Sequence, residues 1–597
     1  MSNLRNSNEE SISKAFLYPL FIVMGIIPLI VHQKEYVTGL SQYQWYTSQE
    51  RANDFFLYYK SFWIVMMAAL MLVILCVKIW NQKCYQMVPK VLIPAGIYGL
   101  FVIISMIFSI NSTFSLKGSM DQFESGFVLL GYLIFMYYAY LLVETEEYLQ
   151  FLMKVWLISM AILCVIGLLQ VIGHDFFATD LGKKLITSRE AWDSLEQLSF
   201  NFGKNRIYLT LYNPNYVGVY ASIAIPILVT LLLFTKQIKM KVIYALLTIG
   251  MIIGIIGSES KTAFLTLAIV VVVGLLVFRT KLLLYWKWLA GGFVACAIVF
   301  IGIDFTLNHS FTNNIKVAIQ NMSNTEESHV SRVDTLDDEI VINYLNQPLH
   351  ISYTRSNENY SCVIKDDEGN DITTVGQENI ILLQDQRFQN IKLMPVLLGE
   401  TYGIQVTVDD SIQWYFSNEA NHGDTTYYFY TPYGKWDKIA NPEAVSMNQK
   451  MFSGRGYIWS RTIPKLKNYV LKGSGPDTYI LVFPQDDYIG LENNGFKGSI
   501  VTKPHNLYLQ IWIQTGLISL IAFLVLYIIY FVQSIRVYGK SKFVTYSEQL
   551  GVGIFLGTIG YMIAGITNDS TITVAPIFWI LLGLGLGINR RLKISRE

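Results

Sequence analysis

The stretch VLIPAGIYGLFVIISMIFSI, residues 91–110, carries no charged side chain over 20 consecutive positions. A run of about 20 apolar residues is long enough for an α-helix to cross the hydrocarbon core of a bilayer. Similar apolar runs recur, for example at 243–257 and 517–532. Of the 597 residues, 52% are hydrophobic and 15% are charged, whereas soluble domains carry about 25% charged residues. The sequence therefore predicts a polytopic membrane protein, and it excludes a soluble enzyme, a fibrous protein or a disordered tail as a description of the whole chain.

Hydropathy predicts a mainly α-helical fold with about twelve transmembrane helices. Lysines and arginines gather in alternate loops such as 78–90, 236–241 and 279–287, and loops rich in these residues tend to stay in the cytoplasm. Both termini are therefore predicted to be cytoplasmic, and the other loops external. The predicted helices are 15–31, 56–79, 91–111, 126–143, 151–172, 215–235, 241–257, 261–279, 283–303, 508–532, 548–567 and 571–589.

One loop of the external set, residues 304–507, is too long to be a plain connector. Near 334–440 it alternates β-branched and aromatic residues with polar ones, between polar turns, which predicts a small all-β, sandwich-like insert. A spacer role and a glycan- or partner-binding role are equally open for this insert. Near 441–507 the pattern becomes helical. The predicted organisation is a membrane domain at 1–303 with nine helices, the external segment, and a second membrane part at 508–597 with three helices.

Two external segments carry candidate anion-binding groups close to predicted helix starts. Arg206 can present a planar fork to a phosphate or a carboxylate. Asn213 and Asn215, on either side of a proline, suit a capped start of the sixth helix. Lys261 follows a serine-rich turn near the start of the eighth helix, and helix N-termini favour anions. A snorkelling arginine, an ordinary helix cap and an interfacial lysine are the simpler explanations, and the residues alone leave them open.

Two more candidates lie in the long external segment. Arg455 stands between two glycines, which allow the backbone to turn closely near a helix start. His505 stands where the segment returns to the membrane, with Asn506 beside it as a supporting residue. An imidazole has an ordinary pKa of ~6.5, so His505 can take up a proton near pH 7. The simpler explanations are a solvated loop arginine and a histidine that caps the tenth helix.

Several classes of chemistry have no support in the sequence. It contains no HExxH, no cluster of three histidines and no GxSxG, so it predicts neither metal catalysis nor a serine hydrolase. The five cysteines form no CxxC pair. The formal net charge of +1 provides no field that would recruit nucleic acid. We expect no metal, no cofactor and no nucleic-acid partner.

Taken in order, four motifs resemble the O-antigen ligase and O-antigen polymerase superfamily of bacterial membrane glycosyltransferases. The resemblance covers roughly residues 90–325 and 445–590, so that 334–440 looks like an insertion. It implies a GT-C-like membrane fold and metal-free transfer of a glycan from a polyprenyl-pyrophosphate carrier to an acceptor hydroxyl on the outer face of the membrane. The motifs are NRIYLTLYNPNYVG at 205–218, SESKTAFLTL at 258–267, SGRGYIWSR at 453–461 with LKGSGPDTY at 471–479, and KPHNLYLQIWIQTGL at 503–517.

The resemblance also suggests roles for the candidate residues. His505 would be the general base that removes the proton of the acceptor hydroxyl. Arg206 and Arg455, and third Lys261, would neutralise the departing pyrophosphate. Where the chain has Lys261 the family more often has arginine, so a two-pronged phosphate contact is less expected there. A single displacement by the hydroxyl would invert the anomeric centre.

Within this family the sequence favours a polymerase of cell-surface polysaccharide. A ligase that transfers the finished glycan to a lipid, protein or wall acceptor is the alternative, and a flippase or transporter is a second one of another class. Transporters carry ionisable residues at the membrane midplane, whereas the candidates here cluster at external helix ends. We expect the bacterial cytoplasmic membrane as the location. The expected partners are a lipid-linked oligosaccharide donor, a glycan or glycolipid acceptor, membrane lipids, and proteins of polysaccharide export and chain-length control.

Overall fold

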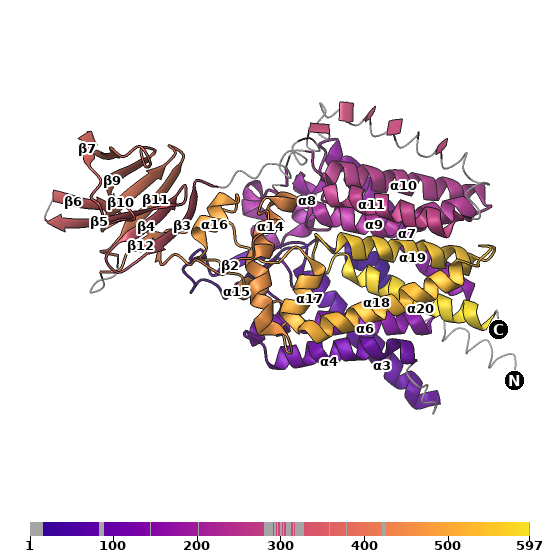
Figure 1. Cartoon of the computed structure of the whole chain (residues 1–597). Coiled ribbons are helices and arrows are strands. Elements are labelled where there is room, and N and C mark those ends of the chain that lie inside the picture. The colour runs from indigo at the N-terminus through magenta and orange to yellow at the C-terminus, as the bar shows by residue number, and fades with distance from the viewer. Residues whose placement is uncertain are drawn as a thin grey trace, which may run out of the picture.

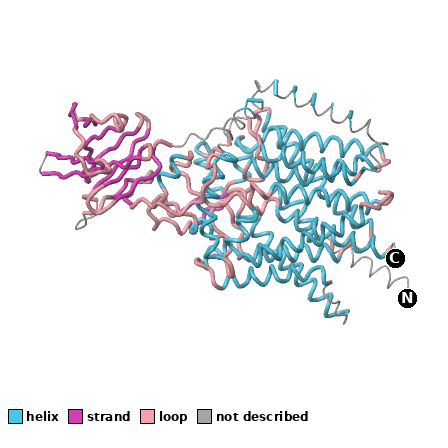
Figure 2. Tube along the Cα trace, viewed as in Figure 1, coloured by secondary structure: helices cyan, strands magenta, loops and turns pink. Residues whose placement is uncertain are grey.

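The computed structural model describes residues 16–82, 89–279 and 328–595, except 144, 201, 204, 357–358, 378 and 421–424, together with short pieces between 290 and 316. A bundle of long helices forms one end of the molecule, and two β-sheets form the other (Figure 1). Short helices and loops lie between the two parts (Figure 2). The last helix, α20, ends at the side of the bundle that faces away from the sheets (Figure 1).

By length and composition, six helices are long and apolar enough to cross a membrane, and three shorter helices are also apolar, counted over the described residues. The chain is therefore a multi-pass membrane protein, and the count of about twelve spans stays a prediction. The ninth predicted span, 283–303, lies largely outside the described residues. The long helices are α3 Tyr58–Gln82, α4 Ile93–Ile107, α6 Gly126–Leu141, α7 Glu146–Val171, α9 Pro214–Phe234, α10 Ile238–Ser258, α11 Lys261–Val277, α18 Leu517–Tyr538, α19 Tyr546–Ala564 and α20 Ala575–Ile594.

Helix α9 is buried at the centre of the bundle, where it packs against α10, α11 and α19. Glycines of α19 make this contact close. A Cβ atom on Gly557 would lie 2.6 Å from the carbonyl oxygen of Ile223, and one on Gly560 would collide with the backbone of Ser222. Small residues let helix backbones approach in this way in membrane proteins. The close packing fixes the position of the α9 N-terminus, which borders the candidate site.

The predicted tenth span, 508–532, is two helices rather than one. Helix α17, Leu507–Thr515, ends at Gly516, and α18 begins directly after it. Gly516 has a φ of 95°, and a Cβ atom there would lie 2.7 Å from the carbonyl oxygen of Leu471. Only glycine suits this backbone conformation and this close approach. Helix α17 is thereby set apart from the span that follows it.

The two larger sheets are antiparallel and share one hydrophobic cluster, to which Ile342 of the first sheet and Val406 of the second both contribute. Sheets joined through their inner faces form a sandwich, and we call this part the β unit, residues 330–437. Its strands are β3 Val330–Thr335, β4 Ile340–Tyr344, β5 Gln347–Ser356 and β6 Asn359–Lys365 in the first sheet, and β7 Thr374–Gln377, β8 Ile380–Leu383, β9 Ile391–Leu398, β10 Thr401–Val408, β11 Ile412–Ser417, β12 Tyr428–Tyr430 and β13 Trp436–Asp437 in the second.

The short helix α16, Tyr488–Asn493, attaches the β unit to the rest of the molecule. The indole nitrogen of Trp414 donates to Glu492 over 2.8 Å, and the Tyr488 hydroxyl donates to Asp437 over 2.6 Å. Asn493 donates to the carbonyl oxygen of Val330 over 2.9 Å. The helix α14, Met451–Thr462, lies next to α16 between the sheets and the bundle (Figure 1).

Candidate active site

His505 lies in the loop that leads into α17 and faces a buried carboxylate. Its Nδ1 is 3.1 Å from Oδ2 of Asp569, which stands in the turn between α19 and α20. The Asp569 side chain is 1% exposed, whereas that of His505 is 29% exposed. His505 has a φ of 50°, a left-handed conformation that side-chain-bearing residues seldom adopt. With Nδ1 turned to Asp569, Nε2 is the ring atom available to a substrate.

Asn506 holds the two loops of this pair together. Its side-chain oxygen accepts hydrogen bonds from the backbone nitrogens of Tyr508 and Leu509 and so caps α17. Its amide nitrogen donates to the carbonyl oxygen of Ile566 over 2.8 Å, and its backbone nitrogen donates to Asp569 over 3.2 Å. The structure therefore places Asn506 as a support of the His505–Asp569 pair.

The charges around His505 favour a neutral imidazole. Burial lowers the pKa of His505, and the negative Asp569 opposes this effect only in part. Burial on its own raises the pKa of Asp569, but the contact with His505 and the positive charges of Lys503 and Arg455 bring the pKa of this carboxyl below its ordinary value. An ionised aspartate beside a neutral histidine is the arrangement that a general base requires.

Arg455 approaches the same pair from α14. The preceding residues Phe452, Ser453 and Gly454 all have positive φ, so the chain turns sharply at this point. The Nη1 of Arg455 donates to the carbonyl oxygen of Phe452 over 3.0 Å, while its Nε is buried without a partner among the described residues. Burial lowers the pKa of Arg455, and the negative charge of Asp569 acts in the opposite direction. Since a guanidinium stays protonated in proteins, Arg455 is a half-buried cation with an unused donor.

Lys503 is a further cation of the site that the sequence analysis did not single out. It is 5% exposed. Its ammonium donates to the carbonyl oxygen of Asp121 and to the hydroxyl of Tyr216, in both cases over 2.9 Å. Burial lowers the pKa of Lys503, but nearby negative groups, Asp569 among them, outweigh this effect and raise it above its ordinary value. Lys503 therefore fixes the His505 loop against the first turn of α9.

Arg206 and Lys261 lie beside the turn between α10 and α11, away from the His505 loop. The Arg206 Nε donates to the carbonyl oxygen of Ser258 over 3.3 Å, so both candidate cations border the turn between α10 and α11. This turn packs on α9, where a Cβ atom on Gly218 would collide with Ser260. Among the described residues no hydrogen bond or ion pair joins Arg206 or Lys261 to the His505–Asp569 pair.

The start of α9 lies between these two groups of cations. Asn213 caps the helix, since its side-chain oxygen accepts a 2.9 Å hydrogen bond from the backbone nitrogen of Asn215, and Pro214 occupies the first helical position. Tyr216, which binds Lys503, and Gly218, which contacts Ser260, both belong to its first turns. The positive end of the helix dipole adds to the attraction for an anion here.

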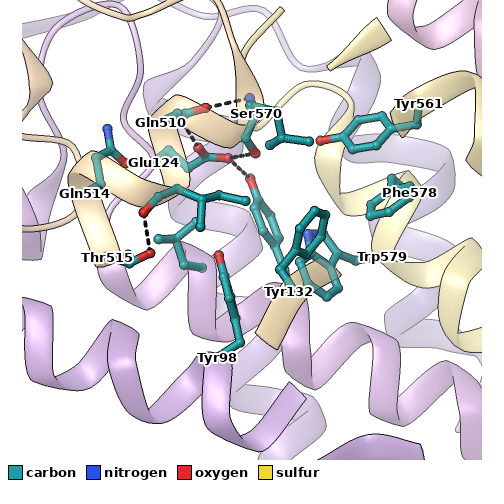
Figure 3. A pocket seen from close by; sticks show the side chains of 14 residues that line it. Tyr98, Glu124, Tyr132, Gln510, Gln514, Thr515, Tyr561, Ser570, Phe578 and Trp579 are labelled. Atoms are coloured by element: carbon teal, nitrogen blue, oxygen red, sulfur yellow. Dashed lines mark hydrogen bonds between the residues drawn. The ribbon is translucent and has the colours of Figure 1, made fainter. Parts of the chain in front are cut away.

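A small, mostly apolar cavity with room for a water molecule borders Ser570, the residue after Asp569, and Figure 3 shows the buried carboxylate of Glu124 that faces it. Glu124 accepts hydrogen bonds from Ser570 over 2.6 Å, Tyr132 over 2.9 Å and Gln510 over 3.1 Å. Burial raises the pKa of Glu124 to about 7, despite these donors. Ser570 directly follows Asp569 in the chain, so Glu124 holds the Asp569 turn from below.

A second buried carboxyl, Asp477, supports the loop that carries Glu124. It accepts hydrogen bonds from the backbone nitrogens of Ser119 and Glu124 over 2.5 and 3.1 Å. Burial raises the pKa of Asp477 to about 8, so this group is largely protonated at neutral pH.

Among the described residues, no group of three or more His, Cys, Asp or Glu side chains has the geometry to hold a metal ion.

One feature of the sequence could have identified Asp569 and Glu124 as candidate functional residues. Both are ionisable residues at the ends of apolar runs, where such groups are costly.

A multi-pass bundle that gathers cations and an Asp–His pair at one end defines a membrane enzyme suited to an anionic substrate. Residues 411–524 match the family model described as O-Antigen ligase. The match contains Arg455 and His505, and it confirms the resemblance to the O-antigen ligase and polymerase superfamily. It supports glycan transfer by an enzyme of the ligase or polymerase type.

The match begins at residue 411, inside the predicted insertion at 334–440, so that β11, β12 and β13 lie in the matched region. The bounds of the insertion stay a prediction. Strand alternation alone gave no means of separating these last strands from the earlier ones. Neither the curated proteins nor the solved structures include a significant match to this chain.

Proposed function

We propose that the protein transfers a glycan from a polyprenyl-pyrophosphate carrier to an acceptor hydroxyl on the outer face of the bacterial cytoplasmic membrane. One observation carries the proposal. The partly exposed His505, paired with the buried Asp569, lies within electrostatic reach of the half-buried Arg455, whose Nε has no partner among the described residues. A base and a free cation next to each other suit an alcohol that must lose a proton while a phosphate leaves.

In the proposed reaction the acceptor hydroxyl gives its proton to Nε2 of His505. The hydroxyl oxygen forms a bond to the anomeric carbon, and the bond from that carbon to the phosphate oxygen breaks. The carrier pyrophosphate takes the electron pair, and Arg455 donates to the anion that forms. Because the hydroxyl attacks the face opposite the leaving group, the anomeric centre is inverted.

Arg206 and Lys261 have a supporting role in this proposal. They border the α10–α11 turn on the other side of the α9 start, and a pyrophosphate has two charged groups to hold. Asn213 and Asn215 shape the helix start between the cations. The reaction needs no metal and no cofactor. Both termini are cytoplasmic in this proposal, and the donor, the acceptor glycan, membrane lipids and polysaccharide-export proteins are its partners.

We favour polymerisation, in which the acceptor is itself a lipid-linked glycan. The β unit lies at the same end of the bundle as α14, which carries Arg455, and offers surface for a long product (Figure 1). Transfer of the finished glycan to a lipid, protein or wall acceptor is the alternative. A purified protein that is given one lipid-linked repeat unit alone distinguishes them, because only a polymerase makes a ladder of products.

The same assay tests the base. In His505→Ala the transfer rate is expected to fall about 10²–10⁴-fold, the usual contribution of a general base. His350→Ala is the matched control, because His350 lies in the β unit and pairs with Glu339. A His505→Ala protein that elongates the lipid-linked glycan at the full rate would refute the proposed role.

A further inference from the structure

A large groove separates the β unit from α14 and α16, and most of the residues that line it have polar side chains. One wall is the start of β3 with the tight turn between β4 and β5. The other wall is the segment before α14 together with the end of α16, which Figure 1 places between the sheets and the helical bundle. The lining residues are Ser328–Ser331, Leu345, Asn346, Ser446–Lys450, Arg461, Gly490, Asn493 and Asn494.

The lining is rich in side-chain amides and contains no carboxylate among the described residues. An amide both donates and accepts hydrogen bonds, as sugar hydroxyls do. The side chains of Asn346 and Lys450 are exposed and form no hydrogen bond or ion pair with other described residues. His329 and Arg461, in contrast, pair with Asp409 and Asp487. Asn346 and Lys450 are therefore free for a ligand, whereas other amides of the lining, such as Gln449, already form hydrogen bonds.

One wall of the groove continues along the chain to the turn that holds Arg455. The backbone nitrogen of Met451 donates to the carbonyl oxygen of Asn448, and that of Tyr457 donates to the carbonyl oxygen of Gln449 over 3.0 Å. The groove wall thus lies directly against the turn of α14 that holds Arg455, whose Nη1 donates to Phe452. A chain molecule whose end reacts near Arg455 can continue from there into the groove.

We propose that this groove binds the glycan strand of the substrate, and that it prefers a hydroxyl-rich strand with neutral or acidic sugars over a basic one. The inference rests on the proposed function and adds to it a binding site remote from the bond that is made. Hydrogen bonds from amides hold the hydroxyls, and Lys450 attracts carboxylate or phosphate substituents.

Two substitutions test the groove without touching the reacting groups. Asn346 has a φ of 64°, so Asn346→Gly removes the amide and suits the turn. Lys450→Glu reverses the free charge. Lys365→Glu is the matched control, since Lys365 is an exposed residue of β6 that does not line the groove. Thermal unfolding of each detergent-solubilised full-length variant verifies that it is folded.

The probe is a set of fragments from the producing strain's own surface polysaccharide, and binding is measured with the inactive His505→Ala background. Each groove substitution is expected to weaken fragment binding about three- to tenfold, the range for one or two lost hydrogen bonds. Added salt should weaken the binding of acidic fragments to the Lys450 protein more than to Lys450→Glu. In the active background, the same variants should make shorter products while Lys365→Glu should not.

The outcomes separate the two proposals. Full activity of His505→Ala would overturn the proposed function. If His505→Ala is inactive, but Asn346→Gly and Lys450→Glu bind fragments and extend chains like the wild type, the proposed function stands and the groove assignment is wrong. Tighter binding of basic than of acidic fragments would refute the stated preference.

Discussion

The cations of the β unit and those at the end of the bundle have opposite surroundings. In the β unit Arg332, Arg355 and Arg387 are at least 28% exposed, and each forms an ion pair with a carboxylate. Arg455, next to the membrane helices, is half-buried, and among the described residues its only hydrogen bond from the guanidinium goes to a carbonyl oxygen. Exposed ion pairs contribute little to stability, whereas a buried donor without a partner, such as Nε of Arg455, is costly.

This difference in surroundings between the β-unit arginines and Arg455 indicates which of them suits an anionic ligand. A half-buried guanidinium with an unused donor suits an anionic ligand, as the proposed function requires. The β unit needs no such ligand, because its own carboxylates neutralise its arginines.

The largest test of the difference between Arg455 and the β-unit arginines is the substitution Arg455→Ala. Loss of one preorganised donor to a departing anion should lower the transfer rate about 10²–10³-fold, measured with a lipid-linked glycan donor in liposomes. Thermal stability should change little, because among the described residues the guanidinium forms no ion pair that the substitution would break. Arg332→Ala is the control and should change both quantities little, by at most about 1 kcal/mol in stability. Equal activities of the two variants would remove the distinction between the two regions.

A smaller effect is expected from Asp569→Asn. The loss of the carboxylate that orients His505 should lower the rate about 10²-fold, the size of effect that a misplaced catalytic group produces. The negative charge of Asp569 raises the pKa of His505, so its removal lowers that pKa further. The acid limb of the pH–rate profile should therefore move to lower pH. A profile that keeps its position, or moves to higher pH, would contradict the pairing.

The smallest effects concern stability, and they should have opposite signs in the two regions. Burial raises the pKa of Asp477 from 3.8 to about 8, so the folded protein binds a proton more tightly than the unfolded chain, and stability falls as pH rises through this range. Hydrogen bonds from Arg387 lower the pKa of Asp366 to about 2, so its contribution is present above pH 3.8 and is lost as pH falls towards 2.

Thermal unfolding across pH measures both groups. Asp477→Asn should flatten the decline between pH 4 and pH 8, and Asp366→Asn should flatten the decline at acid pH. If the contribution of Asp477 to stability rose with pH, as that of Asp366 does, burial would not be the cause of the raised pKa of Asp477.

Much of the fold could be predicted because hydropathy and strand alternation are local signals. The apolar runs led to α3, α4, α7, α9 and α10, whose ends lie within a few residues of the predicted ones. The break at Gly516 was missed because the apolar run continues across it, and what separates α17 from α18 is a contact with Leu471, far away in sequence.

The candidate site was only half accessible to sequence reasoning. His505 and Arg455 stand in recognisable motifs, and the structure brings both to Asp569. Asp569 and Lys503 join them through contacts that bridge long stretches of chain, such as that from Lys503 to Tyr216. Hydrophobic periodicity does not identify such pairs, because it indicates which face of a helix or strand is buried but not which distant residue contacts that face.

The turn between α19 and α20 also has a consequence for synthesis. His505 and Arg455 leave the ribosome well before Asp569, and Leu507 donates to Gly565 only when that turn is in place. A nascent chain that has not yet inserted this last pair of helices holds its imidazole unsupported. The His505–Asp569 pair is thus complete only after most of the chain has been translated.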